Sequence, residues 1–457
     1  MQERAYSHPL VMSRRNSSPD TGLLEGSESF PGRDELSIEE ALGNGAQNEK
    51  SSLAMAFMNM ANSIIGAGII GQAYAVKEAG LLTGIILLVA LTLVIDWTIR
   101  LMVTNAKLSS TYTYQSTVKH CFGPRGLVAV SLAQGMFAFG GSMAYCVIIG
   151  DTIPAVINAI FPKLHSIPVL GWLAHRNVII IVLVMGVSYP LSLNRNIGAL
   201  AKASMLALIS MAIITFTVAF RGPAVSPPDA KMTPSLWTIN SGVFQAISVI
   251  SFAFVCHHNS LIIYDSLKTP TMDRFAQVTH WSTGVSMVAC LMLGVGGFLS
   301  FKDQTKGNVL NNFPRTDTLA NIARFCFGFN MVTTLPLEVF VCREVIVEYF
   351  FPYQVEVSEK IHILIVTIVT LAAMSVSLVT CNLGAILEIL GASSACTVAY
   401  ILPPICFIRL SSQAKYSRPK LYCYACITFG VVVMVISTLQ SLYKIFTGQG
   451  ADTSCIV

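Results

Sequence analysis

Charged residues are scarce in this 457-residue chain, at 12% of the sequence, where soluble domains carry about 25%. Hydrophobic residues make up 53%, and the mean hydropathy is +0.64. Long apolar runs follow one another from residue 53 to residue 446. Lipid rather than water must therefore surround most of the chain, which excludes a soluble enzyme.

Other absences narrow the class further. The 12 Cys are too dilute for a disulfide scaffold, and the 32 Gly and 19 Pro are scattered rather than periodic. The chain has no phosphate-binding GxxxxGK[ST] loop, no HExxH and no GxSxG in a supporting context. The single CxxC, at Cys423 and Cys426, has no second pair that would complete a zinc site. We therefore expect no enzymatic activity, no metal, no organic cofactor and no nucleic-acid partner.

Apolar windows of about 20 residues predict an all-α polytopic membrane protein with eleven transmembrane helices. A tail at 1–52, with nine acidic and five basic residues, is predicted to be disordered and cytoplasmic. The membrane domain then covers 53–446, and a short C-terminal tail covers 447–457. The predicted spans lie near 53–75, 80–103, 127–150, 177–193, 198–220, 241–264, 278–300, 319–346, 361–380, 383–409 and 421–446.

A glycine-rich stretch interrupts the first predicted span, where Gly66, Gly68 and Gly71 fall within six residues. Irregular backbone at membrane depth is tolerated only where protein packs around it or where it lines a polar cavity. A break would free amide hydrogens around Ile65, Gly66, Ala67 and Gly68, and the positive end of the second half-helix would attract a carboxylate. The alternative is a small-residue face for close helix packing. Spacing alone leaves both open.

The sixth predicted span ends in polar groups at a depth that should be hydrocarbon, in the sequence Ser251–Ser260. Such groups usually face a cavity or the interior of the bundle. Because the histidine side chain ordinarily titrates near physiological pH, His257 is a candidate proton-coupling residue, with a neutral imidazole bonded to another helix as the alternative. Glu338 and Glu388 also lie deep in predicted spans. Glu388 is a candidate relay or gating carboxylate, unless it is structurally paired.

Several motifs, in order, resemble the amino acid/auxin permease family. The likeness covers about residues 50–446 and is strongest to its sodium-coupled neutral amino acid transporter branch and to fungal vacuolar amino acid transporters. It rests on Asn62–Gly71 with Tyr74 and Ala79-Gly80, Gly150-Asp151-Thr152, Pro190–Leu193 with Arg195-Asn196-Ile197, Ser251–Ser260 with Tyr264 and Leu267, and Thr334 with Pro336 and Arg343.

The resemblance implies two inverted five-helix repeats plus one extra helix, with the first and sixth helices broken at a central site. It also implies an ion site between the first and eighth spans, on Asn62 and Thr334 with Thr333 as neighbour. Amide, hydroxyl and carbonyl oxygens are suitable ligands for sodium. The alternative for both threonines is hydrogen bonding to their own helix beside Pro336.

These observations predict secondary active transport of amino acids by alternating access, coupled to H⁺ or Na⁺. The substrate carboxylate is expected on the amides of residues 65–68, and its amine near Ser251, Phe252 and Phe254. An amino-acid sensor that signals through the N-terminal tail is the alternative, and an ion channel is a third. The substrate and membrane lipid are the expected partners. The only glycosylation sequon, Asn16-Ser17-Ser18, lies in the tail, which favours a vacuolar or lysosomal membrane over the cell surface.

Overall fold

The computed structural model describes residues 51–163, 171–172, 175–195, 204–352, 357–414 and 416–447. Both predicted tails, up to residue 50 and from residue 448, lie outside these residues, as do residues 196–203 around the start of the fifth predicted span. Every named element in the described residues is a helix. An isolated bridge between Ser51 and Leu267 joins the start of the first helix to the end of the sixth span. The predicted all-helical class is confirmed.

The helices follow the predicted spans closely. In chain order they are α2 (Leu53–Ile65), η1 (Ala67–Gly71), α3 (Gln72–Ala79), α4 (Leu81–Ser109), α5 (Tyr114–Ile160), α6 (Arg176–Leu183), η4 (Val184–Ser188), α7 (Tyr189–Ser192), α9 (Ser204–Phe216), η5 (Thr217–Arg221), η6 (Gly222–Val225), α10 (Pro234–Trp237), α11 (Val243–Phe254) and α12 (His257–Ser266). They continue as α13 (Met272–Phe301), η7 (Lys302–Gln304), η8 (Val309–Asn312), α14 (Thr318–Phe350), α15 (Glu359–Val379), α16 (Leu383–Leu390), η9 (Gly391–Ala395), η10 (Thr397–Ile401), α17 (Leu402–Leu410) and α18 (Arg418–Thr447).

Nine helices in the described residues are long and apolar enough to cross a membrane, and the bent pair Leu53–Ile65 and Ala67–Ala79 makes a tenth span. Each corresponds to one predicted span. The remaining prediction, the fourth, falls on the apolar helix Arg176–Ser192. At no more than 17 residues, this helix is shorter than the roughly 20 residues that cross the hydrocarbon core. The structure thus supports nine or ten spans, and the count of eleven stays a prediction.

Local sequence fixes where several spans begin, because polar side chains cap their first turns. Thr113 and Ser116 form a reciprocal capping box at the start of α5. Asp317 accepts a hydrogen bond from the Ala320 amide at 3.0 Å, and Asn382 accepts one from the Ala385 amide at 3.0 Å. Each cap satisfies a backbone donor that has no partner inside its helix.

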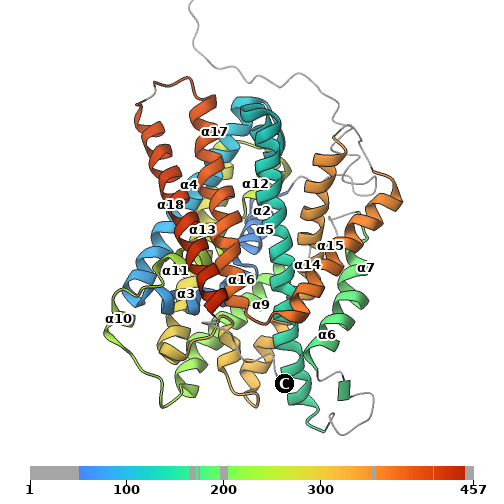
Figure 1. Ribbon diagram of the computed structural model, residues 1–457, viewed down its shortest axis with the longest axis vertical. Helices are drawn as coiled ribbons and strands as arrows, with labels where there is room; N and C mark the ends of the chain where they lie inside the picture. The colour runs from blue at the N-terminus through green and yellow to red at the C-terminus, as the bar shows by residue number, and fades with distance from the viewer. Residues whose placement is uncertain are drawn as a thin grey trace, which may run out of the picture.

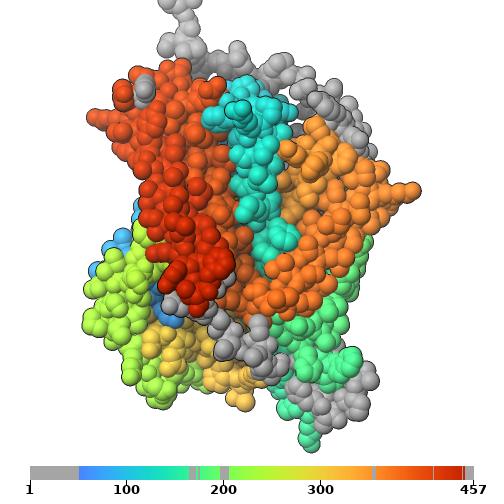
Figure 2. Space-filling model, viewed as in Figure 1, coloured from blue at the N-terminus to red at the C-terminus, as the bar shows by residue number. Residues whose placement is uncertain are grey.

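The interrupted sixth span lies in the centre of the bundle. In the most apolar 18-residue window of Val243–Ser266, 83% is buried inside the protein. The corresponding figure for Arg418–Lys444 is 28%. Figure 1 shows α17 and α18 on one side of α5, and α14 and α15 on the other. In Figure 2 the same order is visible at the surface, with α5 between the two groups. The central helices therefore meet protein on most sides, while α18 faces outward.

Close backbone contact joins α11 to the irregular segment after α16. A Cβ placed on Gly391 would overlap the backbone carbonyl of Ser248, so only glycine fits there. The segments η9 and η10 that follow are π-helical, a widened form often found at functional positions. This contact holds α16 and α17 against the centre of the molecule.

Candidate functional site

The first span is broken within its glycine-rich stretch, where the spacing alone left a break and close helix packing both open. Regular α2 ends at Ile65, Gly66 has φ −22° and ψ −138°, and the chain continues as a 3-10 helix from Ala67 to Gly71. The two halves are bent by 42°. The Gly66 amide donates to the Asn62 carbonyl at 3.2 Å, and Gln72 Nε2 donates to the Gly68 carbonyl at 2.9 Å. Part of the freed backbone is thus satisfied within the span.

The sixth span is also broken, although no Gly or Pro lies at the break. Val255 has φ −73° and ψ 109°, and Cys256 has φ −124° and ψ 18°, between the end of α11 and the start of α12. Just before the break, the Ser251 hydroxyl lies 2.6 Å from the Ile247 carbonyl and 2.9 Å from the Tyr400 hydroxyl. Contacts with neighbouring helices, rather than a glycine or proline in the local sequence, therefore accompany the break in this span.

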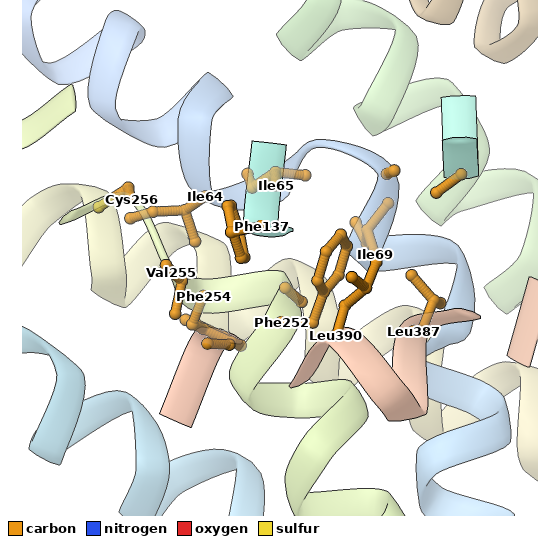
Figure 3. Packing of buried hydrophobic residues seen from close by; sticks show 14 of the residues in the cluster. Ile64, Ile65, Ile69, Phe137, Phe252, Phe254, Val255, Cys256, Leu387 and Leu390 are labelled. Atoms are coloured by element: carbon orange, nitrogen blue, oxygen red, sulfur yellow. The ribbon is translucent and has the colours of Figure 1, made fainter. Parts of the chain in front are cut away.

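The two breaks touch each other. A Cβ placed on Gly68 would overlap the Cα and Cβ of Ala253, so the absence of a side chain on Gly68 is what lets the two spans approach. Figure 3 shows apolar side chains converging around this contact, with Ile64 and Ile65 from α2, Phe137 from α5, Phe252 and Phe254 from α11, and Leu387 and Leu390 from α16. Both interpretations of the glycine stretch, interruption and close packing, are realised.

A small cavity lies where the breaks meet. Its volume is about 20 Å³, which is room for about one water molecule. An amino acid does not fit without movement of the surrounding helices, so this conformation has no room for the substrate. The cavity is lined by Ser63, Ile64, Gly66, Ala67 and Gly68 of the first span, Phe137, Gly141 and Tyr145 of α5, Phe252, Ala253, Val255 and His258 of the sixth span, and Glu338 of α14.

Four of the seven predicted substrate residues line this cavity: Gly66, Ala67, Gly68 and Phe252. The Phe252 ring packs against Phe137, with ring centroids 5.1 Å apart. The other three, Ile65, Ser251 and Phe254, are buried beside the breaks but do not line the cavity. Their positions give them a packing role around the site in this conformation.

The residues predicted to hold a coupling ion do not line the cavity. The Thr334 hydroxyl lies 2.7 Å from the Asn330 carbonyl and 3.1 Å from Asn330 Oδ1. The Thr333 hydroxyl lies 3.0 Å from the same carbonyl. Both threonines thus show the hydrogen bonding to their own helix that was the alternative interpretation. The Asn62 carbonyl accepts the Gly66 amide, and the ion site on Asn62, Thr333 and Thr334 stays a prediction.

The two adjacent histidines point in different directions, as neighbours on a helix must. The predicted proton-coupling residue, His257, is fully buried with Nε2 3.1 Å from the Thr98 hydroxyl on α4. His258 lines the cavity instead, and its ring lies 5.4 Å from that of Phe137. The sequence marked the pair but not which member faces the cavity.

Two further polar residues line the cavity: Tyr145, which sequence reasoning did not select, and Glu338, which it placed deep in a span but gave no role. The Tyr145 hydroxyl donates to Glu338 Oε1 at 3.4 Å, and a Cβ placed on Gly66 would lie 3.4 Å from the same hydroxyl. Glu338 Oε2 is buried without a hydrogen-bond partner in the described residues. In the sequence, Glu338 could have been selected as a carboxylate two residues after Pro336 in an apolar run. A tyrosine in a span has no feature that would mark it as a site residue.

Glu388, by contrast, is embedded in a paired network between three helices. Its Oε1 accepts from the Tyr74 hydroxyl at 2.7 Å and lies 3.4 Å from Lys444 Nζ, and its Oε2 accepts from Ser441 at 3.3 Å. Lys444 also contacts Glu78 at 3.1 Å. The network borders a cavity of about 480 Å³ lined by Glu78 and Lys444 among others. Glu388 therefore shows the structural pairing that was its alternative interpretation.

No group of three or more His, Cys, Asp or Glu side chains within the described part of the chain is placed to hold a metal ion. The polar atoms at the centre are instead hydroxyls, amides, an imidazole and one carboxylate. Such groups suit a small zwitterion and a monovalent cation better than a tightly held metal.

An all-helical, multi-pass membrane protein with two interrupted spans that meet at a central cavity is the class that this fold and site define. Within that class, the chain belongs to the transmembrane amino acid transporter protein family, whose model matches residues 49–443. It is thus an amino acid transporter and not an enzyme, as the motifs predicted.

Curated relatives cover nearly the whole chain. Vacuolar amino acid transporter 2 of Saccharomyces cerevisiae is 45% identical over 430 residues, covering 92% of this chain and 88% of that protein. A protein of Danio rerio named "Putative sodium-coupled neutral amino acid transporter 11" is 36% identical over 407 residues, covering 88% and 89%.

Solved structures show the same fold at low sequence identity. MhsT, crystallised in complex with L-phenylalanine, has a TM-score of 0.58 at 13% identity and covers 87% of this chain and 100% of its own. A mutant of the Eremococcus coleocola manganese transporter has a TM-score of 0.59 at 12% identity and covers 90% and 92%. At this identity the likeness concerns the fold alone.

Proposed function

We propose that the protein is a secondary active carrier, which moves an amino acid together with H⁺ or Na⁺ by alternating access. The single observation that carries the proposal is the pair of interrupted helices that face one small cavity. Discontinuous helices offer backbone donors and acceptors at the middle of the membrane, where a transporter binds its substrate. The family membership supports an amino acid as the substrate, and MhsT, which shares the fold, was crystallised with the amino acid L-phenylalanine.

The substrate carboxylate binds the first amides of the second half-helix. In a 3-10 helix the first amides precede the first possible intrahelical bond, which leaves Ala67 and Gly68 as donors, whereas Gly66 already donates to Asn62. The amine faces the carbonyl end of α11, near Ser251, and the substrate side chain packs against the apolar wall of the cavity. Phe252 belongs to that wall, while Phe254 and Ile65 support it from behind.

Two inverted five-helix repeats plus one further helix account for the positions of the breaks. The interrupted spans are the first and the sixth in the predicted count, five spans apart, as such a repeat requires. Rocking of one repeat against the other would open the cavity to one side at a time. In this scheme residues 53–446 form the transporter domain, between a cytoplasmic tail at 1–52 and a short C-terminal tail at 447–457.

Coupling to Na⁺ places the ion on Asn62, Thr333 and Thr334, and coupling to H⁺ places the proton on a titratable group such as His257. The name of the Danio rerio relative includes sodium coupling, and that of the Saccharomyces cerevisiae relative places it in the vacuole. We place this carrier in the membrane of a vacuole or lysosome.

The test is uptake of a radiolabelled amino-acid panel into proteoliposomes, under an imposed sodium gradient or an imposed pH gradient. Sodium-driven uptake that is reduced at least tenfold in Thr334→Ala supports the ion site at Asn62 and Thr334. Thr428→Ala is the matched control, since Thr428 bonds to the carbonyl four residues earlier in its own helix but lies on exposed α18. Absence of uptake and of exchange under both gradients would overturn the carrier and favour the sensor.

A further inference from the structure

We propose that Glu338 is the residue that binds and releases the coupled proton, so that the carrier is a proton symporter. The inference rests on the carrier function and names the group on which coupling depends. Glu338 projects from α14 into the central cavity. A Cβ placed on Gly141 of α5 would lie 3.3 Å from Glu338 Oε2, so the carboxylate lies directly against the α5 backbone.

The Glu338 carboxylate has fewer hydrogen-bond partners than its two oxygens can accept, which leaves one oxygen available to bind a proton. Oε1 has one long hydrogen bond from the Tyr145 hydroxyl, at 3.4 Å. Oε2 is buried and has no partner among the described residues, and none of the ion pairs found there includes Glu338. A buried carboxylate without a cation is unfavourable at this depth. The cavity therefore closes readily only when the negative charge of Glu338 is neutralised, and a proton bound to Oε2 does this by converting the carboxylate to a carboxylic acid.

Among the described residues, no charged side chain near Glu338 can replace the proton. The titratable residues that share the surroundings of Glu338 are Tyr145 of α5, His258 of α12 and Cys342 one turn along α14. α2 and α9 carry none. Arg343, the next cation along α14, lies over the Phe340 ring at 4.3 Å and contacts His362 of α15 at 3.2 Å.

Among the remaining helices packed against α14, α7 offers only Tyr189, whose hydroxyl is paired with Thr367 at 2.9 Å. The other deep carboxylate, Glu388, already has Lys444 and Tyr74 as partners. Of these two deep carboxylates, Glu338 is therefore the one that has no cation beside it among the described residues. A proton is the cation that can neutralise it.

The position of Tyr145 links the proton to the substrate. Its hydroxyl lies between Glu338 Oε1 and the Gly66 break, where the substrate carboxylate is proposed to bind. When the cavity opens toward the compartment richer in protons, Glu338 takes up one proton. When the cavity opens to the other side, Glu338 returns to the carboxylate form and the proton leaves to water. One proton moves with each amino acid. Transport of a neutral amino acid therefore moves one positive charge, that of the proton, across the membrane.

The experiment measures proton-to-amino-acid stoichiometry and counterflow exchange in proteoliposomes, for the full chain and Glu338→Gln. We expect one proton per amino acid in the wild type and none in Glu338→Gln, with exchange at equal pH on both sides reduced by less than tenfold. Glu338→Asp should recover proton-driven uptake. Glu344→Gln makes the same carboxylate-to-amide change on the same helix at a side chain that is 49% exposed, and should keep one proton per amino acid.

The other outcomes overturn the inference in distinguishable ways. Retention of proton-driven uptake by Glu338→Gln excludes Glu338 as the proton site. Loss of exchange as well as coupling, in a Gln variant that elutes and unfolds as the wild type does, makes Glu338 a ligand of the substrate amine instead. Wild-type exchange without any proton movement rejects proton coupling but leaves the carrier intact. Absence of wild-type exchange is failure of the carrier function itself.

Discussion

At the scale of single residues, the site depends on the missing side chain of Gly68. Gly68→Ala would drive a methyl group into the backbone of Ala253, and such overpacking costs about 1–3 kcal/mol. We expect transport to fall more than tenfold, because the two breaks would be forced apart. Proteoliposome uptake and the unfolding temperature measure the two effects.

The matched control for that substitution is Gly284→Ala in α13, where an added Cβ meets no atom within 4 Å. It should leave transport unchanged and stabilise the helix by about 0.5–1 kcal/mol. Equal loss of transport in both variants would show that glycine content in general, rather than the contact between Gly68 and Ala253, is what matters.

A second residue-scale prediction concerns the pH dependence of stability at Asp317, just before α14. Burial acts to raise the pKa of Asp317, but hydrogen bonds from the Ala320 amide and the Arg221 guanidinium outweigh it and lower the pKa. Asp317 therefore stabilises the fold above its ordinary pKa, and this stabilisation is lost as pH falls through the lowered value. Asp317→Asn should cost about 0.5–1 kcal/mol at pH 7, because Arg221 is 43% exposed.

Unfolding temperatures at a series of pH values measure this effect. The difference between the wild type and Asp317→Asn should shrink as the pH is lowered below 4. Asp229→Asn, on an exposed loop residue, should show no such trend. A difference that grows in acid would contradict the ion pair.

At the scale of elements, the Glu388 network joins α3, α16 and α18. Lys444→Met would leave Glu78 and Glu388 without their cation, and Glu388 is only 3% exposed. We expect a loss of about 2 kcal/mol, less than the roughly 3–5 kcal/mol of a fully buried pair, because the Lys444 side chain is 29% exposed. Thermal unfolding in detergent measures it.

The double variant Lys444→Met with Glu388→Gln should regain part of that loss, because the second change removes one of the uncompensated charges. Lys231→Met, on an exposed residue, is the control. If the double variant is less stable than Lys444→Met alone, Glu388 contributes through Tyr74 and Ser441 rather than through Lys444.

The two interrupted spans show which structural features the sequence can indicate and which it cannot. Glycines at 66, 68 and 71 marked where the first span could break, since backbone propensity is local, although their spacing also suited close helix packing. The break at Val255 and Cys256 had no such residue, and it depends on contacts such as that between Ser251 and Tyr400, which are 149 positions apart. Of the adjacent histidines, only the packing of α12 against α4 and α5 turns His258 rather than His257 toward the cavity.

At the scale of the whole molecule, the cavity of about 20 Å³ requires helix movement before an amino acid enters. We expect added amino acids to slow hydrogen exchange of the amides at 66–71 and 254–258, where the breaks lie, and to leave the centre of α13 unchanged. Hydrogen–deuterium exchange with mass spectrometry, with and without a mixture of proteinogenic amino acids, measures this. Uniform change over all spans would indicate general stabilisation instead.

The sequence by itself determined the membrane class, the approximate positions of ten spans and the family, and it marked the glycine stretch at which the first span breaks, because hydropathy and glycine content act within a single segment. Only the tertiary structure decided which polar groups share the central cavity. Glu338 and Tyr145 are 193 positions apart in the chain, and Glu388 and Lys444 are 56 apart. Whether a buried carboxylate has a cationic partner depends on helices that the chain brings together only when it folds. The sequence pattern therefore could not distinguish Glu388, which contacts Lys444, from Glu338, which contacts no cation among the described residues.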